Sequence, residues 1–205
     1  MISPQQESFN QKIDFSNDYG IDLYIKREDL LHEEISGNKF RKLKYNLEEA
    51  RRQGKTKLLT FGGAFSNHIA AVAAAGRDNG FETVGVIRGE ELENKIAENP
   101  TLRKAQSDGM HLHFITRTQY REKSHPTFLK ELFHQFGDFY LIPEGGTNEF
   151  AVKGCEEILT EEDNIFDFVC CAVGTGGTIS GIINSLQPHQ KALGFPALKG
   201  DFLYD

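Results

Sequence analysis

One lysine of this sequence lies where a charged side chain needs a chemical explanation. Residues 38–50, NKFRKLKYNLEEA, fit a helix, and a rotation of about 100° per residue places Lys39 on one stripe with Leu43 and Leu47. Lys42 falls on a flank, so the apolar face is predicted to carry a single cation, Lys39. Burial or a nearby helix N-terminus lowers the pKa of a lysine and makes its amine a nucleophile for carbonyl groups. The alternative is an ordinary lysine whose ammonium reaches solvent.

A second stretch, GTGGT, has the composition of an anion-binding loop. It follows the apolar run FDFVCCAV and precedes TISGIINSL, an order that indicates a strand, a turn and a helix. Glycines let an anion approach the backbone, and the first turn of a helix presents unpaired N–H groups. Ile179 stands where a dinucleotide-binding pattern needs its last glycine, and no Lys-Ser/Thr pair follows as in a triphosphate-binding loop. These departures favour a single phosphate over a dinucleotide or a triphosphate, bound by Gly174, Thr175, Gly176, Gly177 and Thr178. The alternative is a tight strand-to-helix turn that binds no ligand.

The amine and the anion loop together point to one ligand. An aldehyde and a phosphate on the same small molecule describe pyridoxal 5′-phosphate. We therefore predict this cofactor, with its aldehyde at Lys39 and its phosphate at the GTGGT loop.

The elements that must position these groups alternate along the chain. Strands are predicted at residues 22–29, 57–63, 81–89, 110–116, 138–146, 166–174 and 191–198. Helices are predicted at residues 38–54, 66–80, 99–109, 124–137, 149–162 and 178–186, the second of them capped by Ser66 or Asn67. This alternation predicts an α/β fold with mostly parallel sheets and helices on both faces. Ligands of such folds bind beyond the carboxyl ends of the strands.

Composition limits the classes of partner. The chain has 205 residues, of which 39% are hydrophobic and 26% charged, as in globular proteins generally. A net charge of −7 argues against nucleic acid or an anionic membrane surface as a partner. No apolar run is long enough to cross a bilayer and the polar N-terminus lacks the order of a signal peptide, so a cytoplasmic protein is expected.

The cysteines and histidines suggest no separate chemistry. Three cysteines without a CxxC pair predict no disulfide framework, and Cys170 and Cys171 are expected to pack inside a buried strand. His111 and His113 share one face of a predicted strand without a third ligand, so we predict no metal site.

Four segments, in this order, resemble one known family. They are IKREDLL, GNKFRKLKY, FSNHIAAVAAAG and AVGTGGTISG, and they are spread over residues 25–181. The set resembles the pyridoxal-phosphate enzymes of the tryptophan synthase β-like fold. More narrowly, it is similar to their 1-aminocyclopropane-1-carboxylate deaminase / D-cysteine desulfhydrase family.

The resemblance implies a role for each site residue. Lys39 would bind the cofactor as a Schiff base, and Asn67 would hydrogen-bond the 3′-oxygen of its ring. Ser66 would be catalytic together with Lys39, close to the carboxylate of the substrate. Backbone N–H groups from Gly174 to Thr178 would hold the phosphate.

The resemblance also implies an architecture. Two three-layer α/β domains with mostly parallel sheets are expected: a larger cofactor-binding domain of residues 1–41 plus 150–205, and a smaller one of residues 42–149. The cofactor would lie in the cleft between them. Family members continue well beyond residue 205, so the larger domain is expected to be incomplete.

The implied function is a deaminase or lyase acting on a small amino acid and releasing ammonia and a 2-oxo acid. A homodimer is expected if the complete fold is present. The alternative is a truncated, non-catalytic chain that binds pyridoxal phosphate, or a subunit that needs a partner. His68 stands where the deaminase pattern tends to carry glutamine, which argues against a dedicated cyclopropane deaminase. Its side chain is expected to face solvent, and contact with a substrate carboxylate is the alternative.

Overall fold

The computed structural model describes residues 2–16 and 18–197. The last residues of the larger predicted domain, 198–205, and the end of the last predicted strand lie outside the described part of the chain.

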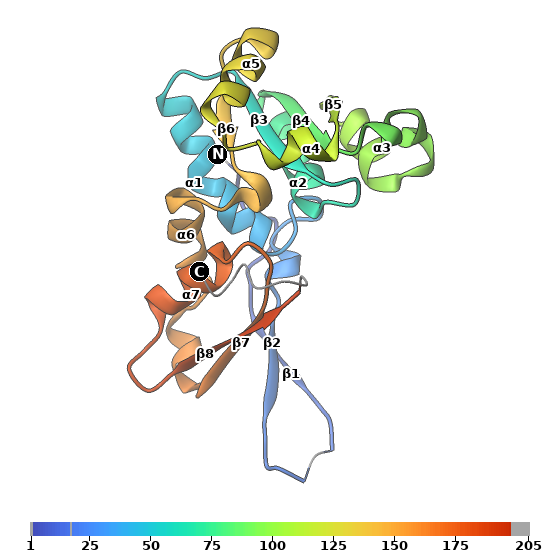
Figure 1. The fold of residues 1–205 in the computed structure, drawn as a ribbon. Helices are drawn as coiled ribbons and strands as arrows, with labels where there is room; N and C mark the ends of the chain where they lie inside the picture. The colour runs from blue at the N-terminus through green and yellow to red at the C-terminus, as the bar shows by residue number, and fades with distance from the viewer. Residues whose placement is uncertain (1, 17, 198–205) are drawn as a thin grey trace.

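A four-stranded parallel sheet forms the upper part of the molecule (Figure 1). Its strands are β3 (Lys57–Gly62), β4 (Glu82–Arg88), β5 (His111–Ile115) and β6 (Tyr140–Ile142), in the spatial order β5-β4-β3-β6. All three strand pairings are parallel. The carboxyl ends of the four strands therefore meet at one edge of the sheet.

Helices cover both faces of this sheet. Side chains alternate between the faces of a strand, so Leu58 enters one core while Leu59 and Phe61 enter the other. The first face is covered by α1 (Asn38–Arg52), α2 (Asn67–Asn79) and α3 (Pro100–Ser107), the second by α4 (Arg117–Arg121) and α5 (Pro126–Phe136). The 3₁₀ segment η2 (Glu90–Glu98) connects β4 to α3. The predicted three-layer α/β arrangement is confirmed for this sheet.

A second parallel sheet, of two strands, lies in the lower part of the molecule (Figure 1). It consists of β7 (Phe168–Val173) and β8 (Lys191–Pro196), and it packs with α6 (Glu149–Cys155) and α7 (Gly177–Ser185). The 3₁₀ segments η3 (Glu144–Gly146) and η4 (Glu161–Ile165) precede α6 and β7. One face of the sheet packs on a small core of Cys155, Ile158 and Ile182.

The opposite face of the β7–β8 sheet is uncovered in the described part of the chain. Phe168 is 55% exposed, Leu193 42% and Phe195 59%, and Cys170 between them is exposed as well. The prediction that Cys170 lies inside a buried strand is therefore wrong. The apolar run does form a strand, but helices cover one of its two faces only.

The N-terminal segment forms a hairpin that extends away from the rest of the molecule (Figure 1). Its strands, β1 (Asn10–Ile13) and β2 (Leu23–Lys26), pair antiparallel, and η1 (Glu28–Leu30) follows. The sequence predicted β2 but not β1, because NQKI is short and mostly polar. It also did not predict α4, a single turn of helix with a Thr116 capping box.

Helix α1 connects the two regions, and its packing against α6 is close. A Cβ atom on Gly154 of α6 would clash with the carbonyl oxygen of Arg41 in α1, so only glycine permits this approach. None of the described helices is long and apolar enough to span a membrane. The division of the chain into residues 42–149 and the two flanking segments stays a prediction.

Candidate active site

The carboxyl edge of the four-stranded sheet faces the glycine loop across a cavity of about 460 Å³. Five predicted site residues line this cavity together: Lys39, Ser66, Asn67, Gly174 and Thr175. A smaller adjoining cavity of about 70 Å³ lies against the glycine loop and shares Lys39, Gly174 and Thr175 with the first. Gly176 and Thr178 line the smaller cavity only. The structure therefore brings the amine, the loop and the start of α2 to one continuous space.

Lys39 reaches both cavities from the first turn of α1. Its Nζ donates a hydrogen bond to Oδ1 of Asn38 at 3.1 Å, and no carboxylate pairs with it in the described part of the chain. Burial lowers the pKa of this amine. An amine with a lowered pKa and no counter-ion is available as a nucleophile or a base.

Lys42 is a second amine of the site, and the sequence placed it wrongly on a flank. It is 2% exposed, against the prediction that Lys39 is the only cation on the apolar face. Its Nζ donates to the carbonyl oxygen of Gly145 and to Oγ1 of Thr147, both at 3.0 Å, and to Oγ1 of Thr175 at 3.4 Å. Burial, with the charge of Lys39 as the second cause, lowers the pKa of Lys42 to about 8.

A signal for Lys42 was present in the sequence. Residues 39, 42, 43, 46 and 47 follow the i, i+3, i+4 spacing of a single buried helix face, and Asn46 and Leu47 are both fully buried. The prediction defined the buried face of α1 by its hydrophobic residues alone. It therefore missed the part of this face that is polar and lies against the glycine loop.

The glycine loop leads into α7 with its backbone donors uncapped. Gly176 is the N-cap residue, with a φ of 84°, and no side chain accepts a hydrogen bond from the first turn. A Cβ atom on Gly174 or Gly176 would meet nothing within 4 Å, so the space over the loop is open. Nδ2 of Asn38 donates to Oγ1 of Thr178 at 2.8 Å, which ties the loop to the start of α1.

Ser66 and Asn67 begin α2 at the opposite wall. Oγ of Ser66 accepts a hydrogen bond of 3.3 Å from the backbone N–H of Ile69, so Ser66 and not Asn67 is the side-chain cap. The side chain of Asn67 is exposed on the cavity side of the helix. The catalytic and cofactor-binding roles of these residues stay predictions.

His68 is buried at 2% exposure, which contradicts the expectation of a solvent-facing residue. Oγ1 of Thr60 donates to the carbonyl oxygen of Ile142 at 2.8 Å, so its only proton is used there. Nε2 of His68 lies 2.8 Å from Oγ1 of Thr60 and must then carry a proton, which it donates to that hydroxyl oxygen. Nδ1 is left buried without a partner. Burial, followed by the charges of Lys39 and Lys42, lowers the pKa of His68 to about 3, so the ring is neutral.

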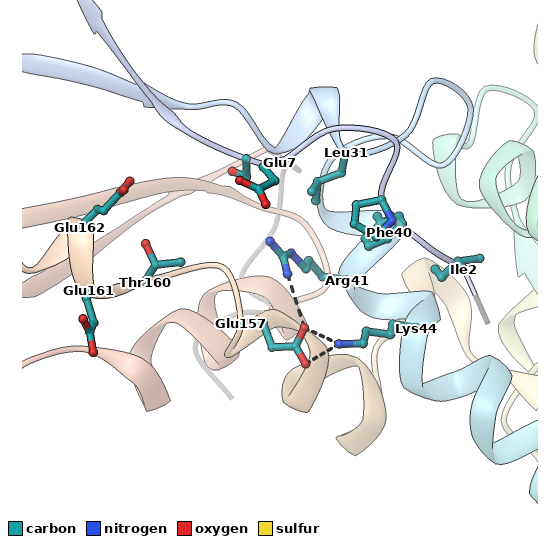
Figure 2. A pocket seen from close by; sticks show the side chains of 12 residues that line it. Ile2, Glu7, Leu31, Phe40, Arg41, Lys44, Glu157, Thr160, Glu161 and Glu162 are labelled. Carbon is teal, nitrogen blue, oxygen red and sulfur yellow. Dashed lines mark hydrogen bonds and ion pairs between the residues drawn. The ribbon is translucent and has the colours of Figure 1, made fainter.

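Another cavity, of about 540 Å³, lies between the N-terminal segment, α1 and the end of α6 (Figure 2). Figure 2 shows Arg41 and Lys44 directed at the carboxylate of Glu157, at 3.4 and 2.7 Å. Arg41 also pairs with Glu28 at 2.8 Å. Since Arg41 and Lys44 are already paired with carboxylates, neither cation is available for chemistry.

The paired histidines of β5 have a packing role. The rings of His111 and His113 lie 5.6 and 5.2 Å from the ring of Phe136. In the described residues, no three histidine, cysteine, aspartate or glutamate side chains gather as a metal site would need.

Comparison with known proteins gives the family. Residues 11–198 match the family described as "Pyridoxal-phosphate dependent enzyme". A putative 1-aminocyclopropane-1-carboxylate deaminase of Thermotoga maritima is 34% identical over 210 residues, which cover 94% of this chain and 63% of the relative. The bifunctional D-cysteine desulfhydrase/1-aminocyclopropane-1-carboxylate deaminase of Arabidopsis thaliana is 33% identical, over 80% of this chain and 44% of that protein.

A solved structure agrees with these matches. The crystal structure of an ACC deaminase homologue aligns with a TM-score of 0.82 and 26% identity, over 99% of this chain and 64% of the other. The chain thus spans less than two thirds of the length of these relatives. With its α/β fold and a match over residues 11–198, the chain belongs to the family of pyridoxal-phosphate dependent enzymes.

Proposed function

We propose that this chain binds pyridoxal 5′-phosphate between Lys39 and the GTGGT loop and acts on a small amino acid as a deaminase or desulfhydrase. The observation that carries the proposal is the shared cavity: Lys39 lines it together with Ser66, Asn67 and the start of the glycine loop. The names of the relatives support the reaction class.

The charges of the site suit a phosphorylated aldehyde. Two amines, the partly buried Lys39 and the buried Lys42, have no carboxylate partner in the described residues. The uncapped first turn of α7 adds the positive end of a helix. A phosphate dianion would balance this positive charge, and the open space over Gly174 and Gly176 leaves room for it.

The two amines suit different ends of the cofactor. Lys39 lines both cavities and so reaches the space in front of Ser66 and Asn67, where an amino acid would bind. Lys42 lines only the small cavity at the loop and is bonded to Thr147 and Thr175. We assign Lys39 to the aldehyde and Lys42, together with residues 174–178, to the phosphate.

The reaction would divide between cofactor and protein. When bound, the cofactor withdraws electrons from the Cα atom of the substrate. Lys39, once the amine of the substrate has replaced it, holds a proton and moves it at a carbon of the substrate, a role that its lowered pKa favours. Ser66 would contact the substrate carboxylate and Asn67 the ring oxygen. Water then supplies the carbonyl oxygen of the product, so that a 2-oxo acid and ammonia are released, and sulfide as well if the substrate is D-cysteine.

A binding-only chain, or a subunit that needs a partner, is the second candidate. The apolar face of β7–β8, which is exposed in the described part of the chain, favours this candidate. Apolar surface of this kind is usually buried against another part of the protein or against a partner. A homodimer, or a second polypeptide on this face, remains part of the proposal.

The test is absorbance and turnover with Lys39→Ala and a matched lysine variant. The wild-type chain mixed with cofactor should turn yellow, and borohydride should bleach it. Lys39→Ala should lose both signals, while Lys44→Ala, whose amine pairs with Glu157 on another face, should keep them. Ammonia and sulfide release from D-cysteine and from 1-aminocyclopropane-1-carboxylate then separates an enzyme from a binder. A wild-type chain that never turns yellow contradicts the proposal.

A further inference from the structure

Asn38, the first residue of α1, lies beside the amine on which the proposed function depends. An asparagine at the start of a helix usually caps the backbone, but no side chain accepts a hydrogen bond from the first turn of α1. The amide of Asn38 instead extends to α7 and lines the small cavity at the glycine loop. Capping therefore does not account for this side chain.

The two ends of this amide have different partners. Oδ1 accepts a hydrogen bond of 3.1 Å from Nζ of Lys39, and Nδ2 donates one of 2.8 Å to Oγ1 of Thr178. An amide oxygen only accepts, and an amide nitrogen and an ammonium group only donate. A flipped amide would place its N–H groups against the ammonium. The orientation with Oδ1 on Lys39 is therefore the one that satisfies both contacts.

Thr178 gives the amide a fixed support. It lies in the first turn of α7, and its hydroxyl also hydrogen-bonds the thiol of Cys155 in α6. Burial raises the pKa of this thiol to about 11, so Cys155 is uncharged and supplies no counter-ion for Lys39. The amine of Lys39 is thus connected to the glycine loop through one neutral side chain that is held at its other end.

No other group accepts a hydrogen bond from Nζ of Lys39 in the described part of the chain. Because the acceptor is a neutral oxygen, it orients the amine and stabilises the ammonium form less than a carboxylate would. One N–H of the amine is enough for this bond, so the lone pair of the neutral amine stays free to take a proton. A carboxylate in this place would favour the charged form, and an apolar side chain would leave the amine without a partner.

We propose that Asn38 is a positioning residue that orients the amine of Lys39 and is itself held in place by Thr178 of the glycine loop. This inference rests on the proposed function and deepens it. In the proposed reaction, Lys39 becomes a free amine once the amine of the substrate has replaced it. A long lysine side chain has many conformations, and Asn38 restricts them to one from which the amine faces both cavities.

The first experiment measures Lys39 in the cofactor-free chain. Brief labelling with acetic anhydride over a range of pH, followed by peptide mass spectrometry, gives the pH midpoint at which this amine loses its proton. Asn38→Asp should raise the midpoint by about one pH unit or more, as an opposite charge in contact does. Asn38→Leu should lower it, since a hydrogen bond to the charged form is lost. Equal midpoints in all three proteins overturn the inference.

Opposite shifts in the two variants are not expected of a residue that only stabilises the fold. Gln106→Glu is the matched control for added charge, because Gln106 is exposed on α3 and lines neither cavity of the site. Lys42, His68 and Cys155 are the titratable groups coupled electrostatically to Lys39, and every variant keeps them.

Variants of Thr178 test the support of the amide, and they decide the matter if the Asn38 variants do not fold. Thr178→Val keeps the shape of the side chain and removes the acceptor for Nδ2 of Asn38. It should lower the midpoint of Lys39, in the same direction as Asn38→Leu. Thr178→Ser, which keeps the hydroxyl, should restore the midpoint. If the valine variant has the wild-type midpoint, the glycine loop does not hold the amide and the inference fails.

A second measurement separates this failure from failure of the proposed function. At saturating pyridoxal 5′-phosphate, the rate at which the yellow absorbance develops should rise with pH, because only the neutral amine reacts. The midpoint of this rise should move upward in Asn38→Asp and downward in Asn38→Leu. A wild-type chain that never turns yellow contradicts the proposed function, while the labelling still decides whether Asn38 controls the amine. A chain that turns yellow with one pH profile in all three proteins keeps its proposed function and loses this inference.

Discussion

Two amines three residues apart on α1 have different surroundings and, in our proposal, different tasks. Lys39 contacts one side-chain oxygen and lines open space, whereas Lys42 is enclosed by Gly145, Thr147 and Thr175. Burial, and after it the same two charges, lower the pKa of His68 and keep its ring neutral. Its unpartnered Nδ1 atom is therefore a buried acceptor beside the site rather than a further cation.

At this scale we predict that Lys42→Met, a neutral residue of similar length, weakens phosphate binding. The probe is pyridoxine 5′-phosphate, which carries the phosphate but no aldehyde. Loss of a charge-assisted hydrogen bond should lower its affinity by about tenfold or more. Calorimetric titration of wild type and variant measures the difference.

The pH dependence of pyridoxine 5′-phosphate binding should show whether Lys42 is the group that binds the phosphate. Lys42 has a pKa of about 8, so it loses its proton, and with it part of its attraction for phosphate, as the pH rises through that value. Wild-type affinity should therefore fall between about pH 7 and about pH 9, since the charged form is the one that binds. Lys39, His68 and Cys155 are the titratable groups coupled electrostatically to Lys42. Because the variant keeps them all, a pH profile as steep as that of the wild type would show that Lys42 is not the responsible group.

The positions of α1, α6 and the four-stranded sheet relative to one another depend on the contact of α1 with α6. Asn46 of α1 and Asn148, the N-cap of α6, exchange hydrogen bonds of 2.7 and 3.1 Å, and Tyr140 of β6 donates to Asn46 at 3.1 Å. Thr147, a partner of Lys42, directly precedes Asn148. The asparagine pair thus fixes the wall of the small cavity at the glycine loop to the four-stranded sheet.

Gly154→Ala should break this arrangement. The added methyl group would clash with the backbone of Arg41, which cannot move aside as a side chain could. Forcing a methyl group into such a contact typically costs about 1–3 kcal/mol, and we expect the free energy of unfolding to fall by about 2 kcal/mol or more. Urea denaturation measures it.

The matched control is Gly174→Ala. Its Cβ atom would meet nothing within 4 Å, so stability should stay within about 0.5 kcal/mol of the wild type. Equal stabilities of the two alanine variants would mean that α1 and α6 are not held at the distance described.

At the scale of the whole molecule, the two parallel sheets differ in how they are covered. Helices pack on both faces of β5-β4-β3-β6 but on one face of β7–β8 in the described part of the chain. The bare face carries Phe168, Leu193 and Phe195. Register places them on the same side, because Phe168 pairs with Lys191 and Ala172 with Phe195. Together they form one apolar patch.

We predict that this patch makes the isolated chain associate. The double variant Leu193→Lys and Phe195→Lys should shift the chain toward monomer and bind less hydrophobic dye, with little change in stability, since exposed positions tolerate substitution to within about 0.5 kcal/mol. Light scattering after size-exclusion chromatography measures the mass. Ile165→Lys is the control, because Ile165 is 74% exposed and lies outside the sheet. If this control shifts the mass as much as the double variant does, the association does not depend on the sheet face.

The sequence alone was enough for the order of most elements, with β1 and α4 missed, and for the α/β class, the cofactor and the grouping of Lys39 with the glycine loop. These follow from local signals: periodicity, caps, small residues at turns and short ordered segments. It also identified Ser66 as one of two possible caps.

Only the tertiary structure decided which side chains are buried where packing is non-local. Lys42 and His68 are enclosed by β6, by the segment after it and by the glycine loop, which come from residues far along the chain, so a helical wheel that follows apolar residues alone misses their burial. Cys170 is exposed for the converse reason, since an apolar strand is buried only if another layer covers it.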